Sequence, residues 1–200
     1  NVTSVGTLTG LTVSADSTIN GVTVGKGANS VSNNTVLGEN ALDAAVTGGN
    51  NTSIGAQTLT VNTSGQKNSA LGSGALSANT TGSHNTAIGY ESMDQNVDGT
   101  NNVAVGSLTL DANTSGTHNT ALGQSALGAN TTGGSNTAVG ANALDTNTTG
   151  SSNVAIGRDA LQTNTTGSNN VVIGYQALYT PNVGNTVAIG YKALYANSDT

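Results

Sequence analysis

The sequence predicts an all-β fold, a repetitive parallel β-roll or β-solenoid with 17-residue coils. Three observations predict it. Glycine recurs in one fixed step from Gly38 through Gly55 and Gly72 to Gly174, and a second series with the same step runs from Gly48 to Gly167. The residue before each first-series glycine is aliphatic, and the 200-residue chain contains no Phe, Trp or Cys. A fixed period of this kind is typical of stacked units that bury apolar surface only against their neighbours.

The start of the chain departs from this period. Residues 1–20 alternate in a different register and are interpreted as a β connector. Residues 21–33 are predicted to form an entry cap, because the interval from Gly25 to Gly38 is shorter than one period. The repeat solenoid should then occupy residues 34–194, in about ten coils, and residues 195–200 form the C-terminal end.

Each unit contains a segment such as Asn85–Gly89, rich in β-branched residues and ending at glycine, which favours a short strand over a helix. Side chains alternate along a strand, so Thr86 and Ile88 share one face and Ala87 the other. Because valine replaces threonine in several units, we expect the Thr and Ile face to line the interior of the coil. A second apolar column lies four positions after each glycine. The predicted core is Ile54, Ile88, Val105, Leu122, Val139, Ile156, Ile173 and Ile189, with Leu42, Leu59, Leu76, Leu127, Leu144 and Leu161.

The small-residue face of the strands is expected to point outward. A strip of alanine and glycine would let a second backbone approach closely, which favours association of chains, with a homotrimer as the preferred state. The strip contains Ala70, Ala87, Ala104, Ala121, Ala138, Ala155 and Ala188. Stretches such as Asn79–Gly82 should supply turns, so that each coil holds two strands and two turns.

Asparagine recurs with the same period from Asn34 to Asn170. Stacked amides can bond to the coils above and below, as in cross-β assemblies, so this column predicts a ladder of polar side chains. A rise of about 4.8 Å per coil gives a rod roughly 50 Å long.

The repeat period is shortened once, near the C-terminal end. The step from Gly174 to Gly190 is one residue short of a full period, and Pro181 replaces the usual asparagine, which predicts a tightened turn.

The charge and composition of the chain argue against nucleic acid, a membrane, a cofactor or a metal as a binding partner. The net charge is -6, and the four cations are widely separated, so no basic patch suits nucleic acid. No apolar run reaches the roughly 18 residues needed for membrane insertion. No cofactor or metal is expected, because His84 and His118 are interpreted as polar turn residues. Glu91 and Asp98, with Asp94 between them, form the densest acidic cluster but are interpreted as non-catalytic.

Two passages carry a resemblance to known proteins. The alternating stretch Val2–Ser14 and repeats such as Asn170–Leu178 resemble trimeric tail-fibre proteins of bacteriophages, especially cyanophages. Val154–Gly157 is more distantly similar to the heads of trimeric autotransporter adhesins. The resemblance implies a homotrimeric, non-enzymatic extracellular fibre in the virion, which contacts other fibre or virion proteins and a host surface glycan or protein. The alternative is a bacterial cell-surface adhesin, and an ice-binding solenoid or a capsule depolymerase are further alternatives.

Four of the five tyrosines lie close to the C-terminus, at Tyr175, Tyr179, Tyr191 and Tyr195. Tyrosine rings are amphipathic, so they can stack on sugar faces or pack against a following domain. They are candidate receptor contacts, with end-capping or domain packing as the alternative interpretation.

Overall fold

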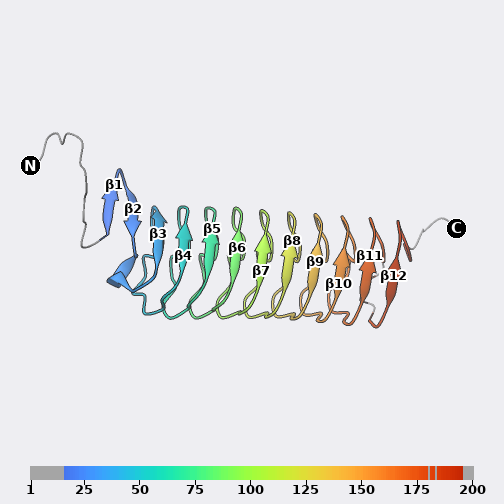
Figure 1. The fold of residues 1–200 in the computed structure, drawn as a ribbon. Coiled ribbons are helices and arrows are strands. Elements are labelled where there is room, and N and C mark those ends of the chain that lie inside the picture. The colour runs from blue at the N-terminus through green and yellow to red at the C-terminus, as the bar shows by residue number, and fades with distance from the viewer. Residues whose placement is uncertain (1–15, 180, 183, 196–200) are drawn as a thin grey trace, which may run out of the picture.

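The computed structural model describes residues 16–179, 181–182 and 184–195. It confirms the predicted fold class: a β-solenoid built on one 12-stranded sheet, in which the strands follow in chain order from β1 to β12. The strands stand in single file along a rod (Figure 1). Most of the predicted connector, residues 1–15, and the end segment 196–200 lie outside the described residues.

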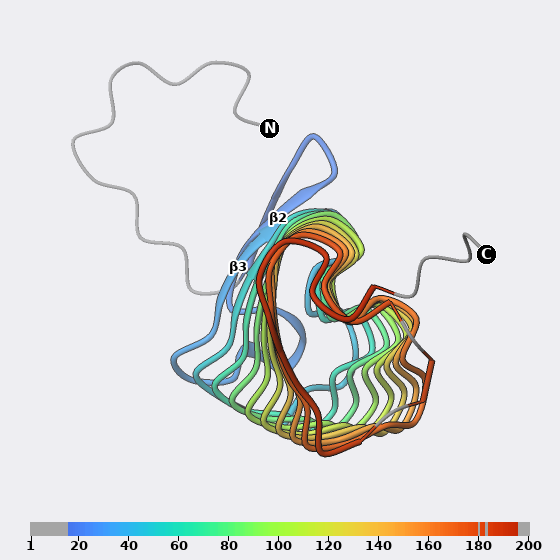
Figure 2. The ribbon, with the colours of Figure 1, turned by 90° about the vertical axis from the view of Figure 1, so that its right-hand side faces the viewer.

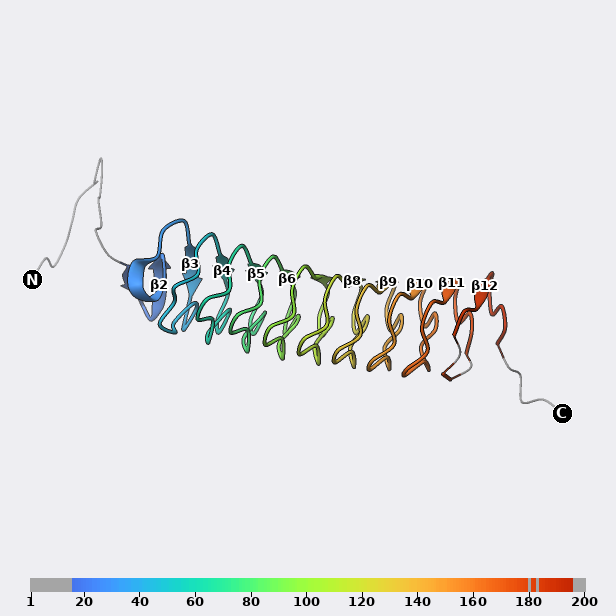
Figure 3. The same cartoon turned by 90° about the horizontal axis from the view of Figure 1, so that it is seen from below.

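An antiparallel hairpin begins the described chain, at the boundary between the predicted connector and the predicted entry cap. Strand β1 (Ser17–Ile19) pairs with β2 (Val22–Gly25), and β2 pairs antiparallel with β3 (Thr35–Gly38). The short 3-10 turn η1 (Ala28–Ser30) connects β2 to β3 and lies at the end of the rod in Figure 3. Because β2 covers the outer edge of β3, the parallel stack is closed at this end.

The strands from β3 onward are parallel, and each pairs with the strand one period further along the chain. They are β4 (Thr52–Ile54), β5 (Ser69–Leu71), β6 (Thr86–Ile88), β7 (Val103–Val105), β8 (Thr120–Leu122), β9 (Thr137–Val139), β10 (Val154–Ile156), β11 (Val171–Ile173) and β12 (Val187–Ile189). The last step, from β11 to β12, is one residue shorter than the others, with Val171 opposite Val187. The missing residue is therefore absorbed in the turn, and the sheet keeps its register.

Each coil contributes one strand, so the prediction of two strands per coil is wrong. The reason is local backbone conformation after the glycine. Glu91 and Met93 both have left-handed backbones, with φ of 50° and 55°, and the corresponding positions of the other coils repeat this. Left-handed residues cannot continue a strand, and for non-glycine residues they cost about 1–2 kcal/mol each. This segment is a compact series of turns that folds the leucine column back over the sheet.

The faces of the strands are reversed relative to the prediction. The central residue of each strand from β4 to β12 points inward, so Ala87 is fully buried, whereas Ile88 is 38% exposed. The expectation that the residue before each glycine lines the interior is thus wrong, and so is the outward-facing alanine strip. The interior of a coil is thin, and the leucine column fills it. Only alanine, serine or valine fits between that column and the sheet.

The leucine column is buried as predicted. Leu42, Leu59, Leu76, Leu127, Leu144 and Leu161 are at most 2% exposed, as are Met93, Leu110 and Leu178. In the last described coil, where none of the described residues forms a further coil over it, Leu194 is 57% exposed. Burial of this column thus depends on the next coil, as stacked repeats require.

The predicted asparagine ladder is present. The side-chain oxygen of Asn85 accepts the backbone N–H of Asn102 at 3.0 Å, and Asn102 accepts that of Asn119 at 2.9 Å. Each side-chain amide also donates to a glycine carbonyl, as from Asn102 to Gly116 at 2.8 Å. A second ladder runs through the turns, where Asn96 donates to the oxygen of Asn79 at 2.8 Å. Its members are Asn62, Asn79, Asn96, Asn113, Asn130, Asn147 and Asn164.

Seen along the rod, the coils superpose closely (Figure 2). The strands form one long side of the cross-section, and the opposite side is indented. Glycine permits this close stacking. A Cβ built on Gly89, whose φ is 139°, would lie 2.6 Å from the carbonyl carbon of Gly106 in the next coil. The glycine columns therefore serve contacts between coils of one chain.

Candidate functional site: outer sheet face and tyrosine cluster

The outward-pointing side of the sheet is the most extended apolar surface of the described rod. We call it the outer sheet face: the first and third residues of each strand from β3 to β12. Its exposed apolar members are Leu37, Leu71, Ile88, Val103, Leu122, Ile156, Val171, Val187 and Ile189. Ile54, Val105, Val139, Val154 and Ile173 are half-buried. Many of these aliphatic residues, such as Ile88, were predicted to lie in the core. Because they lie on the outer sheet face instead, burial within one coil does not account for their apolar side chains.

Strand register keeps the outer sheet face continuous. Ile54 lies opposite Leu71, and Leu71 opposite Ile88, so like side chains form straight rows along the rod. Parallel sheets are ordinarily covered on both faces. A contiguous exposed patch of this kind marks an interaction site in soluble proteins.

The four C-terminal tyrosines form two pairs in the last two coils. Tyr175 and Tyr191 stack with their ring centroids 5.6 Å apart and their planes 13° apart. Tyr179 and Tyr195 lie 5.1 Å apart at 31°. Each pair joins the same repeat position of neighbouring coils, across the shortened last step. The structure thus brings all four sequence-predicted candidate residues to one end of the rod.

Two cations that the sequence analysis did not assign to this site join the tyrosines. The Lys192 Nζ lies 5.6 Å from the Tyr191 ring centroid and 5.0 Å from that of Tyr195. The Arg158 guanidinium lies 5.9 Å from the Tyr175 ring. These distances are within the range of cation–π attraction. We call these six residues the tyrosine–cation cluster. Lys192 follows Tyr191 directly, and Arg158 precedes Tyr175 by one period, so the repeat alignment places both cations near the tyrosine column, although it does not place Lys192 against the rings.

Six of the ten acidic residues are spread along the middle of the rod, from Glu91 to Asp159. The Asp94 carboxylate accepts hydrogen bonds from Ser77 and Gln95, while Asp98 lies exposed in the following turn. Burial raises the pKa of Asp111, and the negative charges of Asp94 and Glu91 raise it further. Burial likewise raises the pKa of Asp145, with a contribution from Asp159.

Both histidines lie where the sequence indicated. His84 and His118 are exposed and have left-handed backbones, with φ of 61° and 59°. In the part of the chain that the structure describes, no three His, Asp or Glu side chains are grouped as metal ligands.

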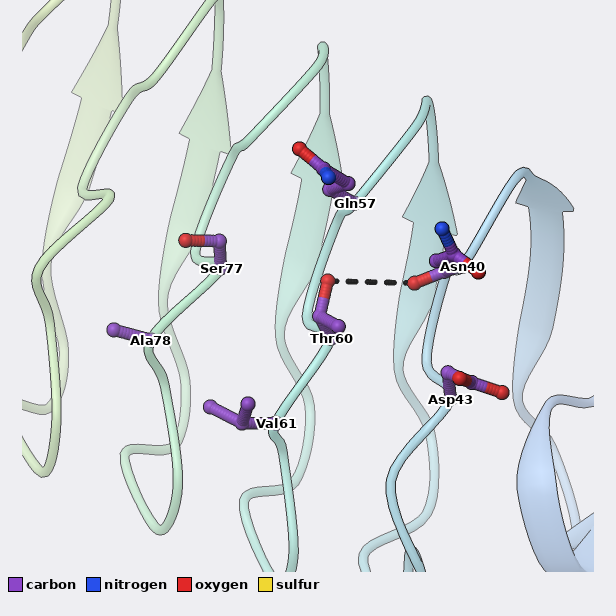
Figure 4. A pocket seen from close by; sticks show the side chains of 7 residues that line it. All are labelled: Asn40, Asp43, Gln57, Thr60, Val61, Ser77 and Ala78. Atoms are coloured by element: carbon purple, nitrogen blue, oxygen red, sulfur yellow. Dashed lines mark hydrogen bonds between the residues drawn. The ribbon is translucent and has the colours of Figure 1, made fainter.

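A shallow open groove of about 470 Å³ crosses the N-terminal coils (Figure 4). Its lining is Asn40, Asp43, Gln57, Thr60, Val61, Ser77 and Ala78. The Thr60 hydroxyl donates to the Asn40 carbonyl at 3.3 Å across it. Asp43 is the one ionisable residue in this lining, so the groove presents small polar and aliphatic groups without an acid–base pair.

The described residues, 16–179, 181–182 and 184–195, contain no helix long and apolar enough to span a membrane. Comparison with family models, curated proteins and solved structures finds no match to this chain. Fold and surface therefore define its class: it is a β-solenoid repeat protein with one exposed apolar sheet face and an aromatic, cationic end.

Proposed function

We propose that this chain is a non-catalytic shaft and receptor-binding segment of a trimeric bacteriophage tail fibre. The observation that carries the proposal is the outer sheet face, a row of exposed and half-buried aliphatic side chains on ten parallel strands. In the proposed fibre this face packs against the same face of sister chains, with the rod axes parallel. The number of chains, three, is supported by the resemblance of the repeats to those of trimeric fibres.

The energetics favour covering this face. Burying the remaining surface of a half-exposed Ile or Leu contributes about 1 kcal/mol, so the row as a whole contributes on the order of 10 kcal/mol. The interior of each coil holds little more than one leucine, two small residues and two asparagines. A fibre built on the outer sheet face would gain its missing second core from its sister chains, as small domains with thin cores require.

Substitutions on the outer sheet face test the assembly. Leu122 and Ile156 are each 38% exposed and lie two coils apart. We expect the native chain to sediment as a trimer and the Leu122→Asp/Ile156→Asp double variant as a monomer, because six carboxylates would be buried in each trimer. Thr132→Asp, in an exposed turn, should leave the trimer intact. A native chain that sediments as a stable folded monomer would refute the proposal.

Location is tested by labelling. Antibodies against the rod should decorate tail fibres of virions in electron micrographs. Decoration of bacterial cell envelopes instead would favour the alternative, a surface adhesin, and reject the phage assignment.

A further inference from the structure

We propose that the tyrosine–cation cluster binds an acidic polysaccharide, with sugar rings stacked on the exposed tyrosine and uronate-type carboxylates paired with Lys192. This inference rests on the proposed attachment function and names the chemical class of the receptor. Its starting point is the order of groups along the rod: Arg158, Tyr175 and Tyr191 are consecutive members of one repeat column.

The last tyrosine of the stack is largely exposed. Arg158 contacts the Tyr175 ring, and Tyr175 stacks on Tyr191. Among the described residues no coil follows Tyr191, and its side chain is 73% exposed. The exposed part of this side chain is a surface that a ligand can contact. The Lys192 ammonium lies 5.6 Å from the centroid of this ring and 5.0 Å from that of Tyr195. The cluster therefore combines exposed aromatic surface with a cation close to two rings.

Charge along the chain favours an anionic ligand at this end. Residues 90–159 contain six Asp and Glu against Arg158 alone, whereas residues 160–200 contain one cation, Lys192, and one acidic residue, Asp199. Arg158 is paired with Asp159 at 3.3 Å. In the part of the chain that the structure describes, Lys192 has no carboxylate partner. Its charge can pair with a carboxylate of the ligand.

The rod contains its own matched comparison. Tyr90 occupies the same repeat column as Tyr175 and Tyr191 and is 54% exposed. The residue after it is Glu91, where Lys192 follows Tyr191. Glu91 accepts a hydrogen bond from Tyr90 and raises the pKa of that phenol. An acidic sugar would be repelled at Tyr90 and attracted at Tyr191, although both side chains leave the fold at equivalent positions.

The test uses the full chain in its assembled state and titrates it with an oligogalacturonate, followed by calorimetry. A neutral galactan oligosaccharide of equal length is the control ligand. We expect oligogalacturonate to bind and the galactan to bind at least ten-fold more weakly. Lys192→Glu and Tyr191→Ala should each weaken oligogalacturonate binding about ten-fold or more, through loss of charge pairing and stacking. Tyr90→Ala should leave it unchanged.

Three results would overturn the inference: equal affinity for the two oligosaccharides, unchanged binding by Lys192→Glu, or no binding of either sugar, which would favour packing against a following domain. Circular dichroism checks that the variants remain folded. Failure of the inference is distinguishable from failure of the proposed function. A trimer that does not bind oligogalacturonate refutes the ligand class alone, whereas a stable monomer refutes the fibre.

Discussion

At the scale of single residues, glycine determines how closely successive coils approach. The first-series glycines from Gly55 onward combine a positive φ with direct contact to the backbone of the next coil. Gly89 and Gly190 have similar φ values, 139° and 128°, but different surroundings. A Cβ on Gly89 would overlap the Gly106 carbonyl group, whereas the nearest atom to one on Gly190 is 3.9 Å away. A substitution at Gly190 would therefore introduce backbone strain alone, whereas one at Gly89 would introduce both backbone strain and steric overlap.

We expect Gly89→Ala to lower the free energy of unfolding by about 2–4 kcal/mol, because it adds overlap with a rigid backbone to the strain of the backbone angle. Gly190→Ala carries the strain alone and should cost about 1 kcal/mol. Chemical denaturation of both variants measures the difference. Equal losses would show that coil spacing adjusts to a methyl group.

At the scale of the repeated element, the asparagine ladders replace much of an apolar core. Each ladder residue is buried. The first ladder bonds to backbone groups of the neighbouring coil, and the second bonds to the neighbouring asparagine side chain and to a glycine carbonyl of its own turn. Asn102, for example, accepts the Asn119 N–H and donates to the Gly116 carbonyl. Buried polar groups stabilise a fold only while all partners are present. The ladders therefore make the stack cooperative from coil to coil.

Removal of one ladder residue should be costly. Asn102→Ala leaves a buried N–H and a buried carbonyl without these bonds, and we expect a loss of about 2–4 kcal/mol in unfolding free energy. The adjacent Asn101 is exposed and left-handed, with φ of 58°. Asn101→Gly keeps that conformation accessible and should change stability by less than about 0.5 kcal/mol. Thermal and urea unfolding of the two variants provides the comparison; similar losses would contradict a structural role of the ladder.

The same element shows what sequence could and could not predict. The repeat period, the buried leucine column and the first asparagine ladder follow from the sequence. In a stack of identical coils, each leucine or asparagine lies next to the equivalent residue of the neighbouring coil. The orientation of the strands did not follow. Both faces of a segment such as Thr86–Ile88 carry apolar groups, and the larger Ile88 favoured the wrong face as interior. The left-handed backbone at Met93, which moves that side chain into the space over Ala87, leaves no signature in composition.

The candidate site was predicted in part. Clustering of the tyrosines was visible in the sequence, but their pairing depended on the shortened step that brings Tyr191 over Tyr175. Lys192 was interpreted only as one of four scattered cations. Its position beside two rings depends on the turn that follows Gly190, whose left-handed residues the sequence did not indicate.

At the scale of the whole molecule, the rod consists of equivalent coils, so removal of one whole repeat keeps the strands of the remaining coils in register. Deletion of residues 90–106 removes one period and joins Gly89 to Ser107, so the remaining strands and ladders stay aligned. We expect this variant to fold, with a shorter rod by small-angle scattering and an unfolding free energy lower by roughly a tenth, as additive repeats predict. Deletion of residues 90–98 removes half a period and should abolish cooperative unfolding. Equal behaviour of the two deletions would contradict coil-by-coil stacking.

The turn before β12 differs from the others in having one residue fewer, yet Val171 still pairs with Val187 and the Thr186 N–H still donates to Asn170 at 3.0 Å. Length variation at this corner is therefore tolerated without disturbing the strands, and Pro181 and Asn182 are exposed there. A short peptide grafted into this corner would be displayed on the flank of the rod near its aromatic tip, which makes the corner a natural attachment point for a reporter label.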